Sequence, residues 1–526
     1  MTLNTTDRAF RHPGVTRLEY RQLEMDRVLT AFLARLKWDG ASNVLARSRD
    51  LTVANFAAIL HGSERFEGFD DDLTRRWLEN HLLDLVNRDK ATEAVAGLRP
   101  LHGDAYRFRN ARRSRPAGAD EQLYALLANA NQGPQTLAFL HEFFFPKAER
   151  GTHFDVETQA VVNLAKAEEA NITDRRANER QRRTDPPLDP QAADRLAEDT
   201  LKLLFHADFV PRSVLVEYLS ILFAFHLALY HLRIMKLLPT WVAGADAATA
   251  VDEGGLFLDV AAVPGQGPAL LAERNAAAWY GRIPDFVHAT FTVKKLEEFA
   301  DNRVKQGRAT RPKHGYVPVP DLIALLGPRH RTQRANFGGT RYSGLLDRIT
   351  EAGSGPDVNP DVRRIQELKL EDFHTYVELI TLFQLDFHRR YITQGLDSLL
   401  LKHHPGAALA QPRRGRRRFV LDSRLLEVLL LTAFLREGGS RGFHTAPLRV
   451  EEFLGTLRER YGLYIDRLPP GDGFTGTHIT DRAALRENSR AFLARLREIG
   501  FYSDTSDAYL TQTITPRYVV PYGTGS

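Results

Sequence analysis

Residues 214–238 read VLVEYLSILFAFHLALYHLRIMKLL and form the longest apolar stretch of the chain. Pro211 lies just before this stretch and Pro239 follows it directly, so a single helix that ends at Pro239 is predicted. A membrane-spanning helix needs about 20 residues with few or no charges. Several ionisable side chains interrupt the stretch, namely Glu217, His226, His231, Arg233 and Lys236. We therefore expect a buried core helix rather than a membrane span.

Helical periodicity continues on both sides of this stretch. Apolar residues recur at spacings of three and four over residues 18–38, 73–86, 120–130, 135–145, 154–177, 192–238 and 362–401. The segment TDPPLDPQ at 184–191 interrupts the pattern, because its prolines cannot sit inside a helix. Residues 241–361 are richer in Gly, Ala, Val and Pro, and within them 301–345 read as a basic loop. The pattern predicts a mainly α protein.

The last part of the chain has its own order of elements. Helical patterns at 423–437, 447–461 and 481–499 precede two β-prone runs around a polar turn at 501–520. Three helices followed by a β-hairpin is the order of a winged helix, although the connection 462–480 is long for that fold. We predict a winged-helix-like C-terminal domain (three helices plus a β-hairpin).

These patterns divide the chain into several domains. At roughly 150 residues per domain, a chain of 526 residues suggests about two to four. The predicted units are an N-terminal helical domain (1–183), a central helical domain (192–401) with an irregular basic insert (about 241–361), a basic linker (402–420) and the winged-helix-like domain (421–526).

Composition excludes several classes of protein. The chain has no cysteine, which excludes a disulfide framework, zinc–thiolate fingers, cysteine-held iron–sulfur clusters and a cysteine nucleophile. The polar N-terminal residues carry no secretion signal, so a cytoplasmic protein is expected. The formal net charge is only +5, but 59 of the 71 basic residues are arginine. That excess fits either a GC-rich genome or phosphate recognition, because guanidinium binds phosphate in a bidentate manner.

Two groups of arginines are candidates for DNA contact. Arg482, Arg486 and Arg490 are spaced at four within the third predicted helix of the C-terminal domain, and so share one face. In a winged helix this helix reads DNA, and arginine contacts phosphates and guanine edges. The predicted basic linker contributes the second group, which consists of Arg413, Arg414, Arg416, Arg417 and Arg418. The alternative is a solvated basic face on a domain that contacts proteins.

Three further arginine clusters lie at predicted loops or helix ends, within residues 107–115, 175–183 and 329–334. Each arginine that neutralises a phosphate contributes about 0.9 to the salt slope of duplex binding. A charge run is usually only a solvated segment, but several clusters in a chain of modest net charge favour phosphate contact by some of them.

Enzyme motifs are mostly absent from the sequence. It contains neither a GxxxxGK[ST] phosphate loop nor an HExxH zinc motif. The string GGSRG at 438–442 matches GxSxG, but a nucleophile elbow requires a strand before the serine, and a helix is predicted there. We therefore predict no catalytic residue and no cofactor.

A metal site is not predicted either. Asp357 or Asp361 followed by Glu367 and Lys369 superficially resembles the D…ExK pattern of metal-dependent nucleases, but the spacing is short and the segment is predicted to be helical. The histidines at 226 and 231 are five positions apart, so they do not share a helix face and are expected to be hydrogen-bonded core residues.

Three segments resemble accessory proteins of bacterial antiphage restriction operons. They are LAFLHEFFFPKAERGTHFDVETQAVVNLAKAEEANITDRR (137–176), LRVEEFLGTLRERYGLYIDR (448–467) and LREIGFYSDTSDAYLTQTITPRY (496–518). The nearest family comprises subunits without an assigned activity in methylation-associated defence systems, and phosphorothioation-dependent restriction subunits are a more distant comparison. The resemblance implies a cytosolic protein that acts with a methyltransferase, a specificity subunit and an ATP-driven translocase. It carries over no catalytic residue.

Three hypotheses about function follow from the sequence. The first is a non-catalytic DNA-binding or DNA-positioning subunit of an antiphage defence complex, with duplex DNA as a partner. The second is a protein–protein scaffold of the same complex without DNA contact. The third and least favoured is a divergent metal-dependent nuclease that cleaves DNA through Asp361 and Glu367.

Overall fold

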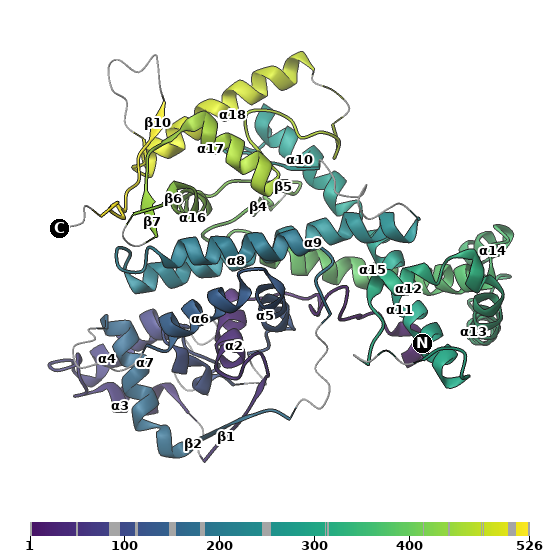
Figure 1. The fold of residues 1–526 in the computed structure, drawn as a ribbon, viewed down its shortest axis with the longest axis horizontal. Coiled ribbons are helices and arrows are strands. Elements are labelled where there is room, and N and C mark those ends of the chain that lie inside the picture. The colour runs from purple at the N-terminus through teal and green to yellow at the C-terminus, as the bar shows by residue number, and fades with distance from the viewer. Residues whose placement is uncertain are drawn as a thin grey trace.

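The structure of the protein is a computed structural model in which helices surround one long central helix (Figure 1). It describes residues 3–48, 51–83, 95–110, 114–146, 154–178, 185–244, 254–310, 312, 315–413, 415–439, 442–474, 476, 478–502 and 512–523. The protein is 59% helical, and the described residues contain the helices α1 to α18 and few short strands. The prediction of a mainly α protein is confirmed.

The central layer consists of α9 (Arg212–Val242) and the preceding α8 (Pro190–Leu204). Among the described helices, α9 alone is long and apolar enough to cross a membrane, and 78% of its apolar window is buried inside the protein, as predicted for a core helix. The predicted helix end at Pro239 is wrong, because α9 continues to Val242. The Thr240 hydroxyl donates to the Lys236 carbonyl at 2.8 Å, which adds a side-chain hydrogen bond to the turn that contains Pro239.

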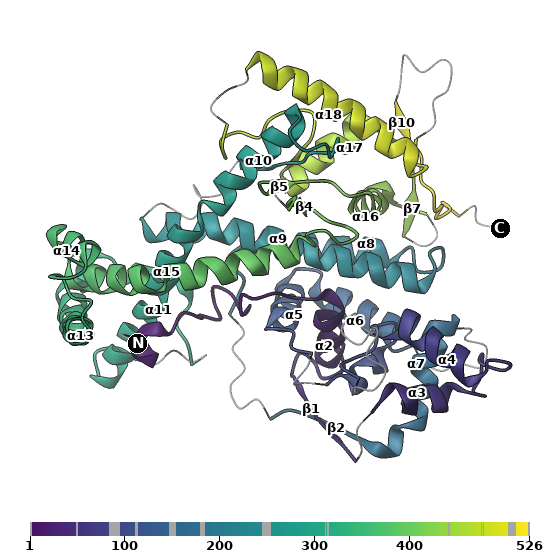
Figure 2. The same cartoon turned by 180° about the vertical axis from the view of Figure 1, so that it is seen from behind.

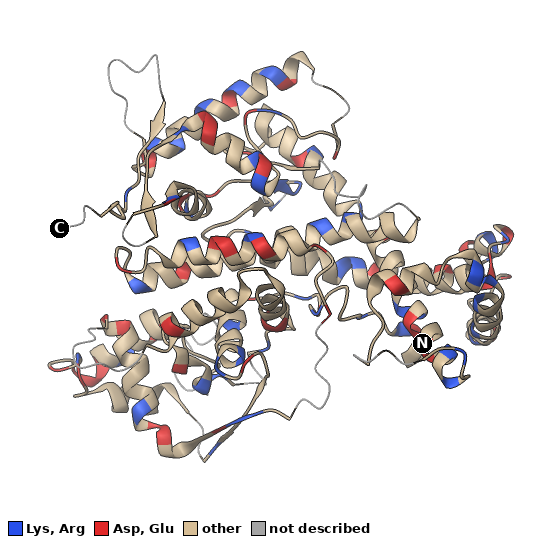
Figure 3. Ribbon diagram, viewed as in Figure 1, with Lys and Arg blue, Asp and Glu red and all other residues tan. Residues whose placement is uncertain are grey.

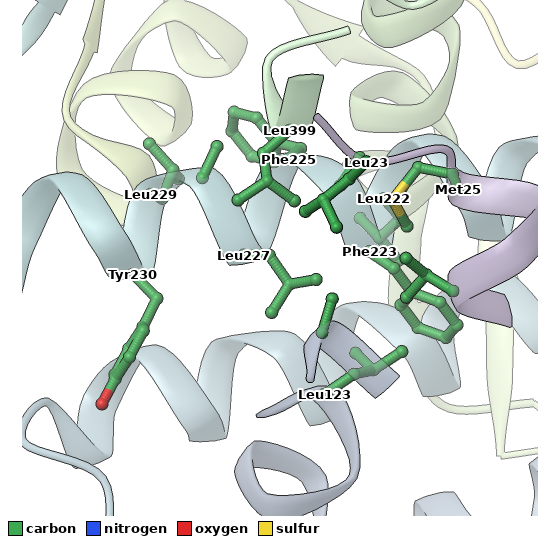
Figure 4. Close-up of a cluster of buried hydrophobic side chains, with 14 of the residues drawn as sticks. Leu23, Met25, Leu123, Leu222, Phe223, Phe225, Leu227, Leu229, Tyr230 and Leu399 are labelled. Carbon is green, nitrogen blue, oxygen red and sulfur yellow. The ribbon is translucent and has the colours of Figure 1, made fainter. Parts of the chain in front are cut away.

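The core forms where α9 meets helices from distant parts of the chain. Figure 4 shows Leu222, Phe223, Phe225 and Leu227 of α9 with Leu123 of α5 (Ala119–Asn129), Met25 of α2 (Met25–Lys37) and Leu399 of α15 (Asp372–Leu399). All these side chains are buried. Burial of one such large apolar side chain contributes about 1.5–3 kcal/mol. Seen from behind, α15 lies beside α9 in the central layer (Figure 2).

The N-terminal lobe packs against one side of the central layer (Figure 1). Its elements are α2, β1 (Asn43–Arg47), α3 (Val53–Leu60), α4 (Asp71–Trp77), the π-helix η1 (Leu78–Leu82), the 3₁₀-helix η2 (Gly103–Phe108), α5, α6 (Gly133–Phe144), α7 (Val156–Ala167), the 3₁₀-helix η3 (Glu169–Asn171) and β2 (Ile172–Arg176). Strands β1 and β2 pair antiparallel. The first helix, α1 (Thr5–Arg8), lies outside this lobe, because Asp7 accepts a hydrogen bond from Tyr376 of α15 at 2.8 Å.

Residues 241–361 are mostly helical where the structure describes them, so the prediction of an irregular insert is wrong. This region contains β3 (Leu256–Phe257), α10 (Gly267–Tyr280), α11 (Ile283–Lys305), α12 (Val319–Ala324), the 3₁₀-helix η4 (Pro328–His330), α13 (Arg331–Glu351) and α14 (Pro360–Glu367). The glycines that suggested a loop lie inside α13. A Cβ on Gly338 would lie 2.4 Å from the backbone nitrogen of Phe373, so glycine here permits close packing of α13 against α15.

The C-terminal lobe lies on the other side of the central layer (Figure 1). Its elements are β4 (Leu409–Ala410), β5 (Arg418–Phe419), α16 (Ser423–Phe434), β6 (Leu435–Glu437), β7 (Phe443–Thr445), β8 (Leu448–Arg449), α17 (Val450–Thr456), the π-helix η5 (Leu457–Tyr461), β9 (Leu463–Tyr464), α18 (Ile479–Glu498) and β10 (Thr513–Ile514). The three predicted helices correspond to α16, α17 with η5, and α18. The helix α10 packs on α18, although the two are far apart in the sequence.

Short strands connect these helices. Strand β10 pairs antiparallel with β8, and an antiparallel bridge joins Tyr502 to Ile514. The turn of the predicted hairpin, residues 503–511, lies outside the described residues. Within the predicted basic linker, β4 and β5 pair antiparallel. The winged-helix assignment and the domain boundaries remain predictions.

Candidate nucleic-acid interface

The arginine row of α18, by which we mean Arg482, Arg486 and Arg490, faces the solvent. All three residues are exposed, and their guanidinium groups form no ion pair within the described residues. Figure 3 shows basic residues along α18, with acidic residues between them. Because an unpaired guanidinium keeps five N–H donors in a planar fork, the row can bind phosphate oxygens or guanine edges.

The opposite face of α18 is buried. Ala484, Asn488, Phe492 and Leu496 follow one another at spacings of four, and each is no more than 4% exposed. These positions are offset by two residues from the arginine row, which in an α-helix places the two sets on opposite sides. Burial of this stripe therefore sets the rotation of α18 and turns the arginine row outward.

Asn488 holds this orientation with directional contacts. Its side chain, which is fully buried, accepts a hydrogen bond from Val260 N at 2.8 Å. Its Nδ2 donates to Leu258 O at 2.8 Å and Ile465 O at 2.9 Å. Asn488 was not predicted from the sequence, and the available signal is a single amide in an otherwise apolar stripe. A buried amide with three bonds to two backbone segments fixes a helix more strictly than apolar packing alone.

The five arginines of the predicted basic linker have different environments. Arg413 and Arg416 are exposed, whereas Arg414 lies outside the described residues. Arg417 is half-buried, and its Nε and Nη2 donate to the two carboxylate oxygens of Asp397, each at 2.9 Å. These bonds raise the pKa of the Arg417 guanidinium above its ordinary value. Arg417 is therefore held within the protein by a bidentate ion pair.

Tyr280 and Arg418 form further contacts that hold the segment around Arg417 in place. The Arg417 guanidinium lies over the Tyr280 ring at 5.1 Å, and the Tyr280 hydroxyl donates to Asp397 at 2.9 Å. Burial, and then the Asp397 charge, raise the pKa of Tyr280 well above its ordinary value. Arg418 is only 4% exposed, and its Nε donates to Asp259 at 2.9 Å. Because Arg417 and Arg418 hold β5 in place, we leave both out of the proposed interface.

A pair of substitutions separates these roles. We expect Arg417→Ala to lower the free energy of unfolding by about 1–2 kcal/mol, because it removes the bidentate bonds to Asp397 and leaves that carboxylate only the more distant ammonium of Lys402, at 3.5 Å, as its charged partner. The matched change Arg416→Ala removes an exposed side chain and is expected to stay within about 0.5 kcal/mol of the unaltered protein. Urea denaturation followed by tryptophan fluorescence measures both. Equal midpoints for the two variants would contradict a structural role for Arg417.

The other arginine clusters also contain arginines whose side chains are bonded to other residues within the protein. Arg334 is 4% exposed and donates to both carboxylate oxygens of Glu371, at 2.8 and 2.9 Å. Arg109 donates to the Ser114 carbonyl at 3.1 Å. Several members of these clusters lie outside the described residues, namely Arg112, Arg113, Arg180, Arg182 and Arg183. Among the arginines of these clusters that the structure describes, the arginine row of α18 combines exposure, one helix face and a fixed orientation.

The histidines of α9 have the roles predicted for core residues. His226 Nε2 lies 2.9 Å from Asp199, and His231 Nε2 lies 3.0 Å from the Thr16 hydroxyl. Both imidazoles are buried. The expectation of hydrogen-bonded core histidines is confirmed.

The residues of the nuclease-like and GxSxG strings do not form a site in the part of the chain that is described. Asp361 and Glu367 lie exposed on the short helix α14, where Asp361 pairs with Arg364 at 3.7 Å. Within the described ranges, no three His, Asp or Glu residues come close enough to hold a metal ion. Ser440 lies outside the described residues.

Comparison with known proteins gives one result that covers nearly the whole chain. Residues 5–518 match the family model described as methylation-associated defense system protein MAD7. The searches of curated proteins and of solved structures returned no match.

Proposed function

Because the chain belongs to the MAD7 family of methylation-associated defence system proteins, we propose that it is a non-catalytic DNA-binding or DNA-positioning subunit of such a system. In this proposal the arginine row of α18 contacts the backbone or bases of duplex DNA. The observation that carries the proposal is a set of three exposed guanidinium groups, without an ion pair among the described residues, on one face of a helix whose other face is held by Asn488.

The order of elements around α18 supports the proposal. Helix α16, strand β8, helix α17 and helix α18 follow one another, and after them come Tyr502 and β10. In space β10 lies between β8 and Tyr502, as expected for the small sheet of a winged helix. In DNA-binding winged helices the third helix enters the major groove, and this helix corresponds to α18.

Membership of the defence system indicates which proteins this protein acts with. Other components of that system are partners of the protein. On the resemblance described above, we propose a methyltransferase, a specificity subunit and an ATP-driven translocase among them. We further propose that the protein acts in the cytoplasm and needs no cofactor of its own.

A salt titration tests the proposal. We expect the full-length protein to bind a short DNA duplex with an affinity that falls steeply with salt, with a slope of log K against log salt of about −3 or steeper. That slope corresponds to about one released counterion for each arginine of the row. Fluorescence anisotropy across a salt series measures it. Weak binding without salt dependence would contradict the proposal.

The second candidate is a scaffold that contacts proteins and never DNA. The observation that favours it is Ile479 in the first turn of α18, which is 86% exposed beside the arginine row. Contact with another protein would bury this apolar side chain and leave the neighbouring arginines at the polar rim. Stable co-purification with other components of the system, together with no salt-sensitive DNA binding, would favour this candidate.

A further inference from the structure

A basic cavity lies between the C-terminal part of α11 and the middle of α13, away from the arginine row. Its volume is about 580 Å³. Four arginines line it, namely Arg303, Arg308, Arg341 and Arg348. The described residues that line the cavity include no aspartate and no glutamate. A cavity of this size that presents four guanidinium groups and no carboxylate is suited to an anion of nucleotide size.

The charges of the cavity are only partly balanced by the surrounding protein. Arg348 pairs with Asp7 at 2.6 Å, and Arg341 approaches Glu298 at 3.7 Å. Within the part of the chain that is described, Arg303 and Arg308 form no ion pair. Two positive charges therefore remain without a carboxylate partner. This is the arrangement by which proteins bind phosphate groups.

Several polar atoms of the cavity residues have no partner within the described residues. Nε of Arg303, Nε of Arg348 and Oε1 of Gln333 are all buried and accept or donate no hydrogen bond there. Buried polar atoms are nearly always paired in native proteins. These three atoms have almost no accessible surface, so they show a cavity wall with unsatisfied hydrogen bonds but do not themselves reach a ligand in the cavity.

Two aromatic rings give the cavity an apolar part. The rings of Phe299 and Phe337 lie 5.5 Å apart, and both residues line the cavity. Arg341 lies over the Phe337 ring at 5.5 Å, and Arg303 over the Phe299 ring at 6.0 Å. Inorganic phosphate would leave this apolar part unused, whereas the base of a nucleotide would contact it.

We propose that the cavity between α11 and α13 binds a nucleoside phosphate, with the phosphates on Arg303 and Arg308 and the base toward Phe337. The proposal concerns binding only. It is independent of DNA contact by α18, and either can fail without the other.

Calorimetry on the full-length protein tests the proposal, with ATP and inorganic phosphate as separate probes. We expect saturable binding of ATP at one site and at least tenfold weaker binding of phosphate. The double variant Arg303→Ala/Arg308→Ala is expected to bind ATP at least tenfold more weakly. Its matched control is Arg329→Ala/Arg331→Ala, which removes two nearby exposed arginines outside the cavity and should leave ATP affinity unchanged.

A second variant tests the position of the site without altering its charge. Gly344 lies on the cavity wall within α13, and the nearest atom to a Cβ there is Nη1 of Arg348 at 3.5 Å. Gly344→Leu therefore fills part of the cavity, and the helix tolerates it because glycine is the weaker helix former. We expect at least tenfold weaker ATP binding in this variant.

Four outcomes would overturn the proposal. The first is no ATP binding by the unaltered protein, and the second is equal affinity for ATP and phosphate. The third is full ATP affinity in both the double variant and Gly344→Leu. The fourth is loss of duplex DNA binding in the double variant together with displacement of ATP by that duplex. The last outcome would identify the cavity as a DNA contact. Retained ATP binding by a variant of the arginine row would support two separate sites.

Discussion

Asp199→Ala is expected to destabilise the protein by about 3–5 kcal/mol, because it removes a buried carboxylate that three donors share and leaves the buried His226 and Tyr461 without that acceptor. Asp199 of α8 is completely buried. Its carboxylate accepts hydrogen bonds from Arg460 Nη2 at 2.6 Å, Tyr461 Oη at 2.8 Å and His226 Nε2 at 2.9 Å. These partners come from η5 and α9, so one side chain joins the C-terminal lobe to the central layer.

The charge state of this cluster follows from its contacts. Burial acts to raise the pKa of Asp199, but the hydrogen bond from His226 and the charge of Arg460 outweigh it and hold that pKa below its ordinary value. Burial lowers the pKa of His226, so its imidazole is neutral and donates through Nε2. Burial and Asp199 raise the pKa of Tyr461, which therefore stays protonated. Three donors thus surround one charged acceptor.

Glu198→Ala is the matched control for this prediction. Glu198 is the neighbouring residue and pairs with Nη1 of the same Arg460 at 2.9 Å, but its side chain is 39% exposed. An exposed pair contributes about 0–1 kcal/mol, so this variant is expected to unfold close to the unaltered protein. Urea denaturation followed by circular dichroism measures the midpoints. If Asp199→Ala and Glu198→Ala shift the midpoint equally, the role assigned to Asp199 is wrong.

Short-range patterns in the sequence predicted the helices well where apolar spacing decided them. The apolar stretch at 214–238 predicted α9, and the spacing of four predicted a common face for the arginine row. Local patterns gave the wrong prediction at α13, where glycines such as Gly338 suggested a loop and the structure has a helix. Gly338 instead permits close contact with the backbone of Phe373, a residue of a different helix.

Pairings between distant residues could not be predicted from local patterns. Arg418 and Asp259 are 159 positions apart, and Arg417 looked equivalent to its neighbours until its contact with Asp397 was known. The runs of arginine therefore predicted solvent exposure for side chains, such as those of Arg417 and Arg418, that in the structure form ion pairs within the protein. Asn488 was missed for the same reason, since its three partners lie in segments far from it in the sequence.

Reversing two charges of the arginine row is expected to have the largest effect on DNA binding. Arg486→Glu/Arg490→Glu removes two cations that each contribute about 0.9 to the salt slope, so we expect the slope to fall by about 2. The two new carboxylates also repel phosphate, and we expect duplex affinity to fall about 100-fold at low salt. Anisotropy with the duplex used for the unaltered protein measures both quantities. The fold should be retained, because both side chains are exposed and unpaired among the described residues.

Arg75→Glu/Arg76→Glu is the matched control, because it changes the net charge by the same amount on α4 of the N-terminal lobe. Both arginines are exposed, and within the described residues their ion-pair partners are Glu79 and Asp72, each one helical turn away. If net charge alone drove binding, the two double variants would lose affinity equally. If α18 contacts DNA, the loss is confined to Arg486→Glu/Arg490→Glu, since a screened charge acts on phosphate only within about 10 Å. Unchanged affinity in that variant would exclude α18 as the DNA-contacting helix and favour the scaffold.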